Sequence, residues 1–376
     1  MRILYMNYSE ITSPGGVHKV IREIAKNLSI KGHEVIVLQA NPLNLPEEEI
    51  YEGFKIIRVR SILGNRFYGL SLSLYFYLKN HLTELNPDII HVHGYHTLFS
   101  HEAIFILKVM LNVQKPIVFS PHYGTHGSFV GEYLACVYKV IGRRCFQLSD
   151  RIICASQFEG KTVAKDFGIS SQKIVIIPHG VNQIEIPNRL RNKNRDFISL
   201  LYAGYLLRKK GVQFILKALQ QLKYTYQRRV ILSIIGNGNY KKELIKLAKK
   251  LKIEDSIYWY PFLNTKELNE KIKGADIFLL LSESENYGII VAEALALGIP
   301  CIVADTTALS EFTNEPGCFG VDYPPDPKEV AKLVLKIMDS NIKVGPFSKK
   351  IRVWDEVVSE YERVYVNLLK MKKGFK

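Results

Sequence analysis

Short, apolar, β-branched runs alternate with helix-like patterns along this chain, and the alternation occurs as two separate series. Strands that are apolar on both faces are typical of parallel sheets covered by helices. The sequence therefore predicts an α/β protein with two doubly wound, Rossmann-like domains in tandem. The predicted strands are RILYMNYS, HEVIVLQA, DIIHVHG, PIVFSPH and DRIICAS in the first series, and FISLLYAG, RVILSIIGNG, SIYWYPF, DIFLLLS and PCIVAD in the second.

Helical periodicity and one polar stretch set the predicted domain boundaries. The segment QIEIPNRLRNKNRD is rich in charged and amide residues, which is typical of an interdomain linker. Apolar residues at helical spacing predict helices over 16–32, 70–86, 97–112 and 128–148. The predicted parts are a first domain at 1–182, the linker at 183–197, a second domain at 198–348 and an amphipathic C-terminal helix at 349–376.

The composition argues against several classes of protein. No run reaches 18 uncharged apolar residues, and the first residues lack a signal-peptide pattern, so we expect no transmembrane helix. Five cysteines without a CxxC pair argue against a disulfide framework or a zinc site and favour a reducing cytoplasm. The net charge of +15 suits phosphorylated ligands or an anionic membrane face. Nucleic acid is not expected, because no nucleic-acid-binding module is recognisable.

Glycines follow several predicted strands, at the positions where open α/β sheets bind ligands. Gly15 and Gly16 separate the first strand from the first helix, and Gly204 and Gly236 follow two strands of the second series. Glycine lets the backbone approach a ligand closely, and a helix start offers its amides to an anion. Plain tight turns are the alternative. Two such domains that face each other would share one ligand cleft.

A histidine and a group of cations also follow strands. His122 ends the run PIVFSPH, where either a structural role or a ligand contact is open. Arg208, Lys209 and Lys210 precede Gly211 and a predicted helix. Cations beside a helix start suit a diphosphate, because both the side-chain charge and the helix dipole favour an anion.

Two glutamates lie eight residues apart in the segment ESENYGIIVAEALALGIPCIVA. We expect Glu285 in a loop and Glu293 on a helix that runs from Gly288 to Leu297. A fully helical segment of eight residues would separate them by about 12 Å. That spacing suits one ligand with hydroxyl groups at both ends and a diphosphate between them, the latter facing the amides near Tyr287 and Gly288.

Taken together, these motifs resemble glycosyltransferase family 4, whose members have the GT-B fold. The resemblance covers nearly the whole chain and rests on PGGVHKV, DIIHVHG, VIIPHGVN, the "KG" that contains Lys210, and the E-x7-E pair followed by Gly-Ile-Pro. It implies an N-terminal acceptor-binding domain, a C-terminal donor-binding domain, and a last helix that crosses back to the first domain.

The resemblance also implies the reaction and the roles of residues. A hexosyl group would move from a UDP- or GDP-linked sugar to a glycan or lipid-linked acceptor, with retention of configuration. No Asp-x-Asp motif is present, so we expect no metal and no other cofactor. The expected catalytic residues are His122, Glu285 and Lys210. The expected donor-binding residues are Gly15, Gly16, Gly204, Arg208, Gly236, Tyr287, Gly288 and Glu293.

Two departures from the family pattern keep other hypotheses open. Tyr205 stands where the family often has arginine, and ADTTALSEF lacks the family's glycine pair, with Glu311 at the later acidic position. The alternatives are a degenerate donor-binding or scaffold subunit, and a nucleotide-sugar epimerase or phosphorylase on the same fold. The basic segment YKVIGRRCF and the aromatic segment RFYGLSLSLYFYLKNHL suit either core packing or peripheral contact with the cytoplasmic membrane face.

Overall fold

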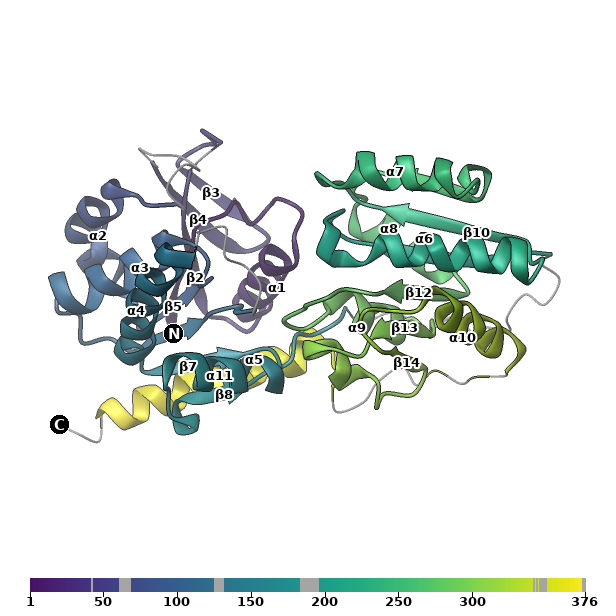
Figure 1. Ribbon diagram of the computed structural model, residues 1–376. Helices are drawn as coiled ribbons and strands as arrows, with labels where there is room; N and C mark the ends of the chain where they lie inside the picture. Colours follow the sequence, from purple (N-terminus) through teal and green to yellow (C-terminus); the bar gives the residue numbers. More distant parts are fainter. Residues whose placement is uncertain are drawn as a thin grey trace. The chain divides into compact units, whose positions relative to one another are not determined.

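The computed structural model describes residues 1–41, 43–60, 69–124, 132–182, 196–340, 342, 344 and 350–373. Contacts divide the chain into two compact units (Figure 1). The first comprises Met1–His179 with Trp354–Lys376, and the second comprises Gly180–Val353. Each unit is a Rossmann-like α/β domain built on its own sheet. Most of the predicted linker, residues 183–195, lies outside the described residues.

The first unit contains an eight-stranded sheet in the order β3-β4-β2-β1-β5-β6-β7-β8. All pairs are parallel except β3 with β4, which form an antiparallel hairpin at one edge. The sequence did not predict this hairpin or the short strand β8. The strands are β1 (Arg2–Asn7), β2 (Glu34–Ala40), β3 (Glu48–Tyr51), β4 (Phe54–Val59), β5 (Ile89–His93), β6 (Ile117–Ser120), β7 (Arg151–Cys154) and β8 (Ile174–Ile176).

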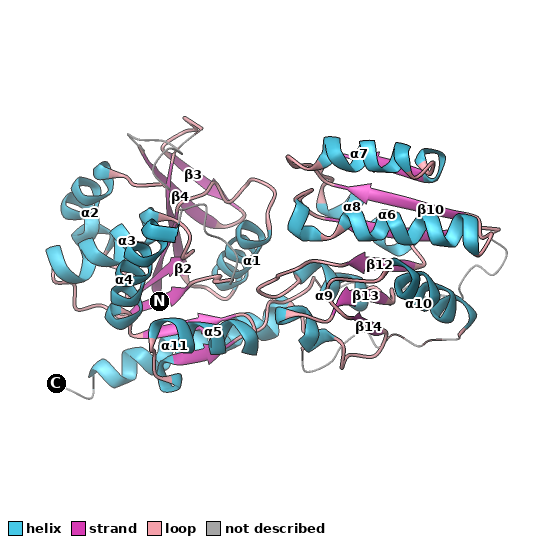
Figure 2. Ribbon diagram, viewed as in Figure 1, coloured by secondary structure: helices cyan, strands magenta, loops and turns pink. Residues whose placement is uncertain are grey.

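Helices cover both faces of this sheet (Figure 2). One face packs against a cluster that takes in Leu78, Phe99, Phe146 and Phe167, one from each of α2, α3, α4 and α5. The last helix, α11, contacts α1. The helices are α1 (Gly16–Ile30), α2 (Leu72–Leu85), α3 (Leu98–Phe105), α4 (Glu132–Leu148), α5 (Gln157–Phe167) and α11 (Trp354–Lys373), with a π-helical turn η2 (Ile106–Met110) and a 3-10 turn η3 (Ser171–Lys173).

Buried hydrogen bonds tie α11 into this sheet. Tyr365 Oη lies 2.7 Å from Tyr5 Oη and 2.7 Å from His91 Nδ1, and all three side chains are fully buried. A buried hydroxyl or imidazole needs such partners, because leaving it unsatisfied costs about 1–3 kcal/mol. The C-terminal helix is therefore part of the first unit.

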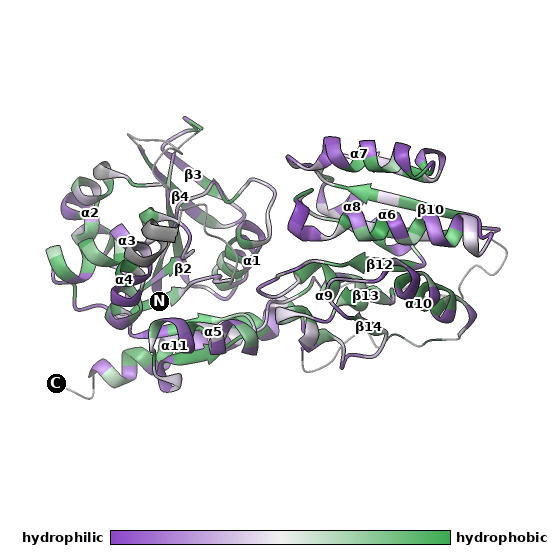
Figure 3. Ribbon diagram, viewed as in Figure 1, coloured by the Kyte–Doolittle hydropathy of each residue, from purple (hydrophilic) through white to green (hydrophobic). Residues whose placement is uncertain are grey.

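The second unit contains a six-stranded parallel sheet in the order β11-β10-β9-β12-β13-β14. Its strands are β9 (Ile198–Ala203), β10 (Val230–Ile235), β11 (Ile257–Tyr260), β12 (Ile277–Leu280), β13 (Cys301–Ala304) and β14 (Cys318–Val321), the last of which the sequence did not predict. The apolar strands and the mostly hydrophilic α7 are visible in Figure 3.

In this unit α6 contacts both α7 and α10, while α9 contacts β12 and β13. The helices are α6 (Val212–Gln220), α7 (Lys241–Lys250), α8 (Thr265–Gly274), α9 (Ile289–Ala296) and α10 (Pro327–Asp339). Shorter turns are η4 (Arg208–Lys210), η5 (Gln221–Thr225), η6 (Glu254–Ser256) and η7 (Thr307–Phe312). The predicted helix from Gly288 is one residue too long at each end, because Gly288 is the N-cap of α9 and Leu297 its C-cap.

Candidate functional site

In the second unit the strand order reverses between β9 and β12. These strands are neighbours although β10 and β11 lie between them in the chain. Open α/β sheets bind ligands beyond the carboxyl ends of the strands at such a reversal. The loop after β9 carries Tyr205 to Gly211, and the loop after β12 carries Ser282 to Gly288. Of the residues predicted for donor binding, Arg208, Tyr287 and Gly288 therefore lie in these two loops, together with Lys210 and Glu285.

An ion pair connects these two loops. Lys210 Nζ lies 2.6 Å from Glu285 Oε1, and the two side chains are only 19% and 16% exposed. The Ser282 hydroxyl donates a second hydrogen bond to the same carboxylate oxygen, at 2.8 Å. The site thus holds a cation that suits an anion and a carboxylate that suits hydroxyl groups.

Backbone contacts hold the cationic loop against β12. Glu283 N donates to Lys209 O at 2.8 Å. A Cβ on Gly211 would lie 1.8 Å from the carbonyl oxygen of Leu281, and Gly211 has a φ of +75°. Only glycine combines that conformation with so close a contact. Gly211 therefore fixes the turn that directs Lys210 toward Glu285, while Arg208 on the same turn is exposed.

The loop after β13 supports Glu285 from its other side. Glu285 N donates to Thr307 Oγ1 at 3.0 Å, and Ala308 N donates to Glu285 O at 3.3 Å. Thr307 has a φ of +51°, which is rare and strained for a β-branched residue. This loop lacks the family's glycine pair, and here a threonine in a glycine-like conformation anchors Glu285. Farther along, Glu311 accepts a hydrogen bond from Lys350 Nζ at 2.8 Å.

Helix α9 begins beside this loop. Its N-cap, Gly288, has a φ of +97° and a ψ of 50°. The side chain of Tyr287 is 3% exposed, packs on Phe312, and donates to Lys350 O at 3.2 Å, so burial raises its pKa. Tyr287 therefore contributes its backbone, rather than its ring, to the surface at the start of α9. Glu293 lies on α9 and is 5% exposed.

Gly204 and Gly236 bring the loops after β9 and β10 together. A Cβ on Gly236 would lie 1.9 Å from Gly204 O, and Gly204 N donates to Ile235 O at 3.0 Å. Close packing of the two backbones thus requires glycine at 236, independently of any ligand. Tyr205 follows Gly204 in the loop after β9 and is 43% exposed. Its ring packs edge to face on Phe262, with the ring centroids 5.0 Å apart.

In the first unit, Gly15 is the N-cap of α1 and Gly16 its first residue. A Cβ on Gly15 would lie 2.9 Å from His18 Nδ1, whereas one on Gly16 would meet nothing within 4 Å. The same imidazole nitrogen lies 3.3 Å from Ser13 O. Glycine at 15 is therefore needed to close the turn, and Gly16 leaves the first amide of α1 uncovered.

His122 follows β6 and has a φ of +48°, uncommon for a residue other than glycine. Its Nε2 lies 3.1 Å from Nδ1 of His93, the last residue of the neighbouring strand β5. Burial, with smaller contributions from His96 and His18, lowers the pKa of His122 to about 4. The imidazole is therefore neutral at pH 7 and exchanges hydrogen bonds rather than charge.

A buried carboxylate fixes the backbone next to His122. Glu159, at the start of α5, accepts hydrogen bonds from Tyr123 N at 2.6 Å and from Ala155 N at 2.7 Å. Burial raises the pKa of Glu159 to about 7. The Tyr123 hydroxyl donates to Asp166, also on α5, at 2.8 Å. Helix α5 thus holds the turn in which His122 takes its unusual conformation.

Sequence reasoning missed several of these supporting residues. His93 lies inside the quoted motif DIIHVHG, but its partner is 29 residues away in the chain. Glu159 carries the signature of a helix N3 residue after the N-cap Ser156, yet its carboxylate turns to Tyr123 instead. Ser282 and Thr307 carry no signal of their own. Contacts with segments distant in the chain decide the roles of His93, Glu159 and Thr307.

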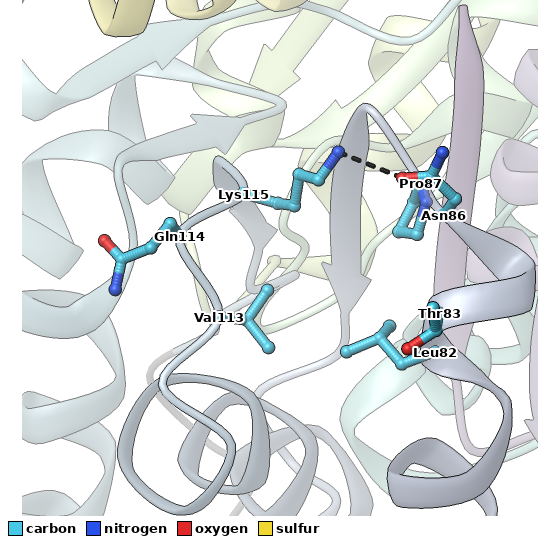
Figure 4. A pocket seen from close by; sticks show the side chains of 7 residues that line it. All are labelled: Leu82, Thr83, Asn86, Pro87, Val113, Gln114 and Lys115. Atoms are coloured by element: carbon cyan, nitrogen blue, oxygen red, sulfur yellow. Dashed lines mark hydrogen bonds between the residues drawn. The ribbon is translucent and has the colours of Figure 1, made fainter. Parts of the chain in front are cut away.

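One surface hollow lies away from all these residues (Figure 4). It has a volume of about 380 Å³ and lies between the end of α2 and the segment that precedes β6. Lys115 Nζ donates across it to Asn86 Oδ1 at 3.3 Å. It lies at the amino ends of β5 and β6, opposite to the ends that carry His93 and His122. Its lining residues are Leu82, Thr83, Asn86, Pro87, Val113, Gln114 and Lys115.

Two negative findings apply to the described residues. No described helix is long and apolar enough to cross a membrane. No group of three or more His, Cys, Asp or Glu side chains in the described ranges is arranged to hold a metal ion. The four cysteines whose side chains are described, Cys145, Cys154, Cys301 and Cys318, are free and buried.

Comparisons with known proteins cover most of the chain. The family "Glycosyltransferase Family 4" matches residues 14–183, and "Glycosyl transferases group 1" matches residues 183–354. An uncharacterized glycosyltransferase of Methanocaldococcus jannaschii is 23% identical, and the match covers 95% of each chain.

Solved structures extend the comparison to the fold. Sucrose-phosphate synthase from Thermosynechococcus elongatus superposes with a TM-score of 0.77 at 16% identity, covering 99% of this chain and 98% of that one. The Anabaena protein HepE in complex with UDP-glucose has a TM-score of 0.67 at 15% identity, covering 98% and 97%. This likeness identifies the fold as GT-B.

Proposed function

The chain belongs to glycosyltransferase family 4, and we propose that it transfers a hexosyl group from a UDP- or GDP-linked sugar to a glycan or lipid-linked acceptor. The observation that carries the proposal is the Lys210–Glu285 pair at the strand reversal of the second unit. It sets an anion-binding cation and a hydroxyl-binding carboxylate 2.6 Å apart, beside the start of α9. A sugar linked to a diphosphate has both of the groups that this pair suits.

In this proposal the donor is held from its two ends. Lys210, with Arg208, binds the diphosphate, assisted by the amides at Gly288 and by the helix dipole of α9. Glu285 accepts hydrogen bonds from the sugar hydroxyls. Glu293 accepts hydrogen bonds from the ribose, which UDP and GDP share. Gly204 and Gly236 keep the loops compact enough for the nucleotide to lie over them.

The proposed reaction retains the anomeric configuration. Negative charge grows on the departing diphosphate as the glycosidic bond breaks, and stabilising that charge is the main catalytic task. Lys210 and the start of α9 would perform it without a metal ion. His122, neutral at working pH, would position the sugar or the incoming hydroxyl by a hydrogen bond. Gly15 and Gly16 would admit the ligand to the start of α1.

We place the acceptor with the first unit and propose that it is reached at an anionic membrane surface. Helix α4 exposes Val140 (71%) and Ile141 (40%) beside the cations Lys139, Arg143 and Arg144. The helix in contact with it, α3, ends at Phe105 and continues into η2, and Phe105, Val109 and Met110 are about half exposed. Apolar side chains flanked by cations suit the interface of an anionic bilayer.

This membrane contact is tested by sedimentation with anionic and neutral vesicles. We expect binding to anionic vesicles only, and its loss in a Val140→Ser/Ile141→Ser variant. Equal recovery of the wild type with and without anionic vesicles would remove the membrane from the proposal and leave a glycan acceptor in solution.

The donor assignment is tested first by calorimetry with UDP, GDP, ADP and their common sugars. We expect one nucleotide to bind, and Glu293→Ala to weaken it about 10- to 100-fold, because hydrogen bonds to a charged group contribute about 1.5–3 kcal/mol. Failure of every nucleotide to bind would refute the donor site and favour a scaffold role.

Product analysis then separates the remaining alternatives. A transferase consumes the nucleotide sugar only when an acceptor is present, apart from slow hydrolysis, and the new linkage keeps the donor's anomeric configuration. An epimerase converts the nucleotide sugar without any acceptor. A degenerate subunit binds the donor and does neither.

A further inference from the structure

His93 is buried directly behind His122. Its side chain is fully buried at the end of β5, and its Nδ1 lies 3.1 Å from Nε2 of His122. One face of its ring stacks on His91, with centroids 4.2 Å apart, and the ring of Tyr5 lies at 5.3 Å. His91 is held in turn by Tyr365 and Ser120, at 2.7 and 2.9 Å. His93 therefore has one orientation and one polar contact with the turn that carries His122.

Both imidazoles of this pair are neutral near pH 7. Burial lowers the pKa of His93 well below its usual value, and the pKa of His122 lies at about 4. Each ring then carries one proton, and a single hydrogen bond between them needs a proton on only one of the facing nitrogens. The position of that proton decides which nitrogen of His122 can donate.

The other nitrogen of His93 distinguishes the two arrangements. Its Nε2 is buried and has no hydrogen-bond partner among the described residues. If His122 donated, the proton of His93 would sit on Nε2 as a buried N–H without an acceptor. If His93 donates from Nδ1, its Nε2 is unprotonated and leaves only an acceptor without a partner. Buried N–H groups without a partner are the rarer case in folded proteins.

We propose that His93 is a positioning residue that donates from Nδ1 to His122 and thereby holds His122 as the tautomer with its proton on Nδ1. His122 then presents an N–H, rather than a lone pair, on the side of its ring away from His93. In the transferase proposed above, on which the catalytic part of this inference rests, that N–H serves as a hydrogen-bond donor to a substrate oxygen. Because Nδ1 of His122 carries a proton in this tautomer, it cannot act as a general base.

The first test reads the proton directly and needs no turnover. The full chain is labelled with 15N-histidine, and the His122 signals are assigned by their loss in His122→Gln. We expect the Nδ1 resonance of His122 in the protonated range and Nε2 in the unprotonated range at pH 7. The reverse pattern would overturn the tautomer assignment, whether or not the protein proves to be a transferase.

The second test compares two variants of nearly equal size, His93→Asn and His93→Leu. Asparagine can offer an N–H near the position of Nδ1, whereas leucine cannot. By analogy with other residues that orient a functional histidine, we expect leucine to lower kcat by about 10- to 100-fold. Asparagine should recover most of that loss, and nucleotide affinity should stay unchanged in both, because the proposed function assigns neither His93 nor His122 to the nucleotide.

Thermal unfolding separates this role from a structural one. The leucine and asparagine variants should unfold within a few degrees of each other while their kcat values differ. If kcat in His93→Leu equals that of the wild type, or falls only in proportion to the folded fraction, His93 does not position His122. If the wild type transfers no sugar, the proposed function fails, and the 15N spectrum still decides the tautomer.

Discussion

Replacing Glu285 by glutamine should move nucleotide binding and turnover in opposite directions. In the structure, Lys210 is paired with the Glu285 carboxylate, 2.6 Å away. At an effective dielectric constant of 20, two unit charges at that distance attract each other by about 6 kcal/mol. Desolvation of the two mostly buried side chains offsets much of this, so we expect a net coupling of about 1–3 kcal/mol. A diphosphate that binds Lys210 must compete with this carboxylate.

Glu285→Gln removes the competing charge and keeps the oxygen that accepts from Ser282. We therefore expect the variant to bind the free nucleoside diphosphate about 3- to 10-fold more tightly, which corresponds to roughly 1 kcal/mol. It should transfer sugar at least 10-fold more slowly, because a neutral amide is the weaker acceptor for sugar hydroxyls. Calorimetry with UDP or GDP and initial-rate assays measure the two effects separately.

Two further tests make this reasoning refutable. Glu283→Gln changes a carboxylate on the same loop that no described cation pairs with, so it should alter neither affinity nor rate by more than about twofold. The double-mutant cycle of Lys210→Met with Glu285→Gln should give a coupling energy in unfolding of about 1–3 kcal/mol. Additive single effects, or weaker diphosphate binding by Glu285→Gln, would show that the carboxylate does not compete for Lys210.

Three more expectations follow from buried contacts. Burial raises the pKa of Glu159 from 4.5 to about 7, so the folded state binds a proton more tightly than the unfolded state does. The free energy of unfolding should therefore fall by about 3 kcal/mol as the pH rises from 4.5 to 7, relative to Glu159→Gln. Urea titrations across that range measure this difference. Gly236→Ala should lower the free energy of unfolding by several kcal/mol in thermal or urea melts, because its Cβ would overlap Gly204 O at 1.9 Å. Tyr365→Phe removes a hydroxyl that is hydrogen-bonded to buried His91, so it should lower the free energy of unfolding by about 1–3 kcal/mol in the same assay. Tyr361→Phe, on the same helix, is the control variant.

The sequence allowed the two sheets and the positions of most strands to be predicted, because buried parallel strands leave a continuous apolar signal. It missed the edge strands β3, β8 and β14, and also β4, which lies inside the first sheet. The hairpin strand β3 reads EEIY, with alternating exposed and half-buried residues, and it pairs only with β4. The last strand, β14, reads CFGV and holds a glycine. Edge strands bury less surface than central ones, so their sequences carry a weaker hydrophobic pattern.

The candidate site was predicted residue by residue but not as contacts. Lys210 and Glu285 were each expected near the donor, yet nothing in their spacing indicates that they pair across 75 positions. Their meeting follows from the order of the strands, since β9 lies beside β12 only because the chain crosses over the sheet. The pattern of apolar runs in the sequence does not depend on the order of the strands in the sheet. The contact between Lys210 and Glu285 is therefore visible only in the folded structure.

The glycines show a related limit of prediction from sequence. Gly236 was expected to let a ligand approach closely, but its missing side chain first makes room for the carbonyl of Gly204, as the missing side chain of Gly211 does for the carbonyl of Leu281. Both reasons predict glycine at the same place in the sequence, namely the loop after a buried strand. Only the distance from the absent Cβ to its nearest atom separates them.

The two units supply different electrostatics at the carboxyl ends of their sheets. In the second unit the loops after β9 and β12 bring together a cation and a carboxylate, both able to exchange charged partners for a ligand. In the first unit the end of β5 and the loop after β6 bring together two neutral imidazoles, one fully buried. A departing diphosphate needs positive charge near it, whereas a sugar or hydroxyl oxygen needs only a directed hydrogen bond. In the proposed function, charge chemistry therefore belongs to the second unit, and the first would contribute orientation through His122 and His93 behind it.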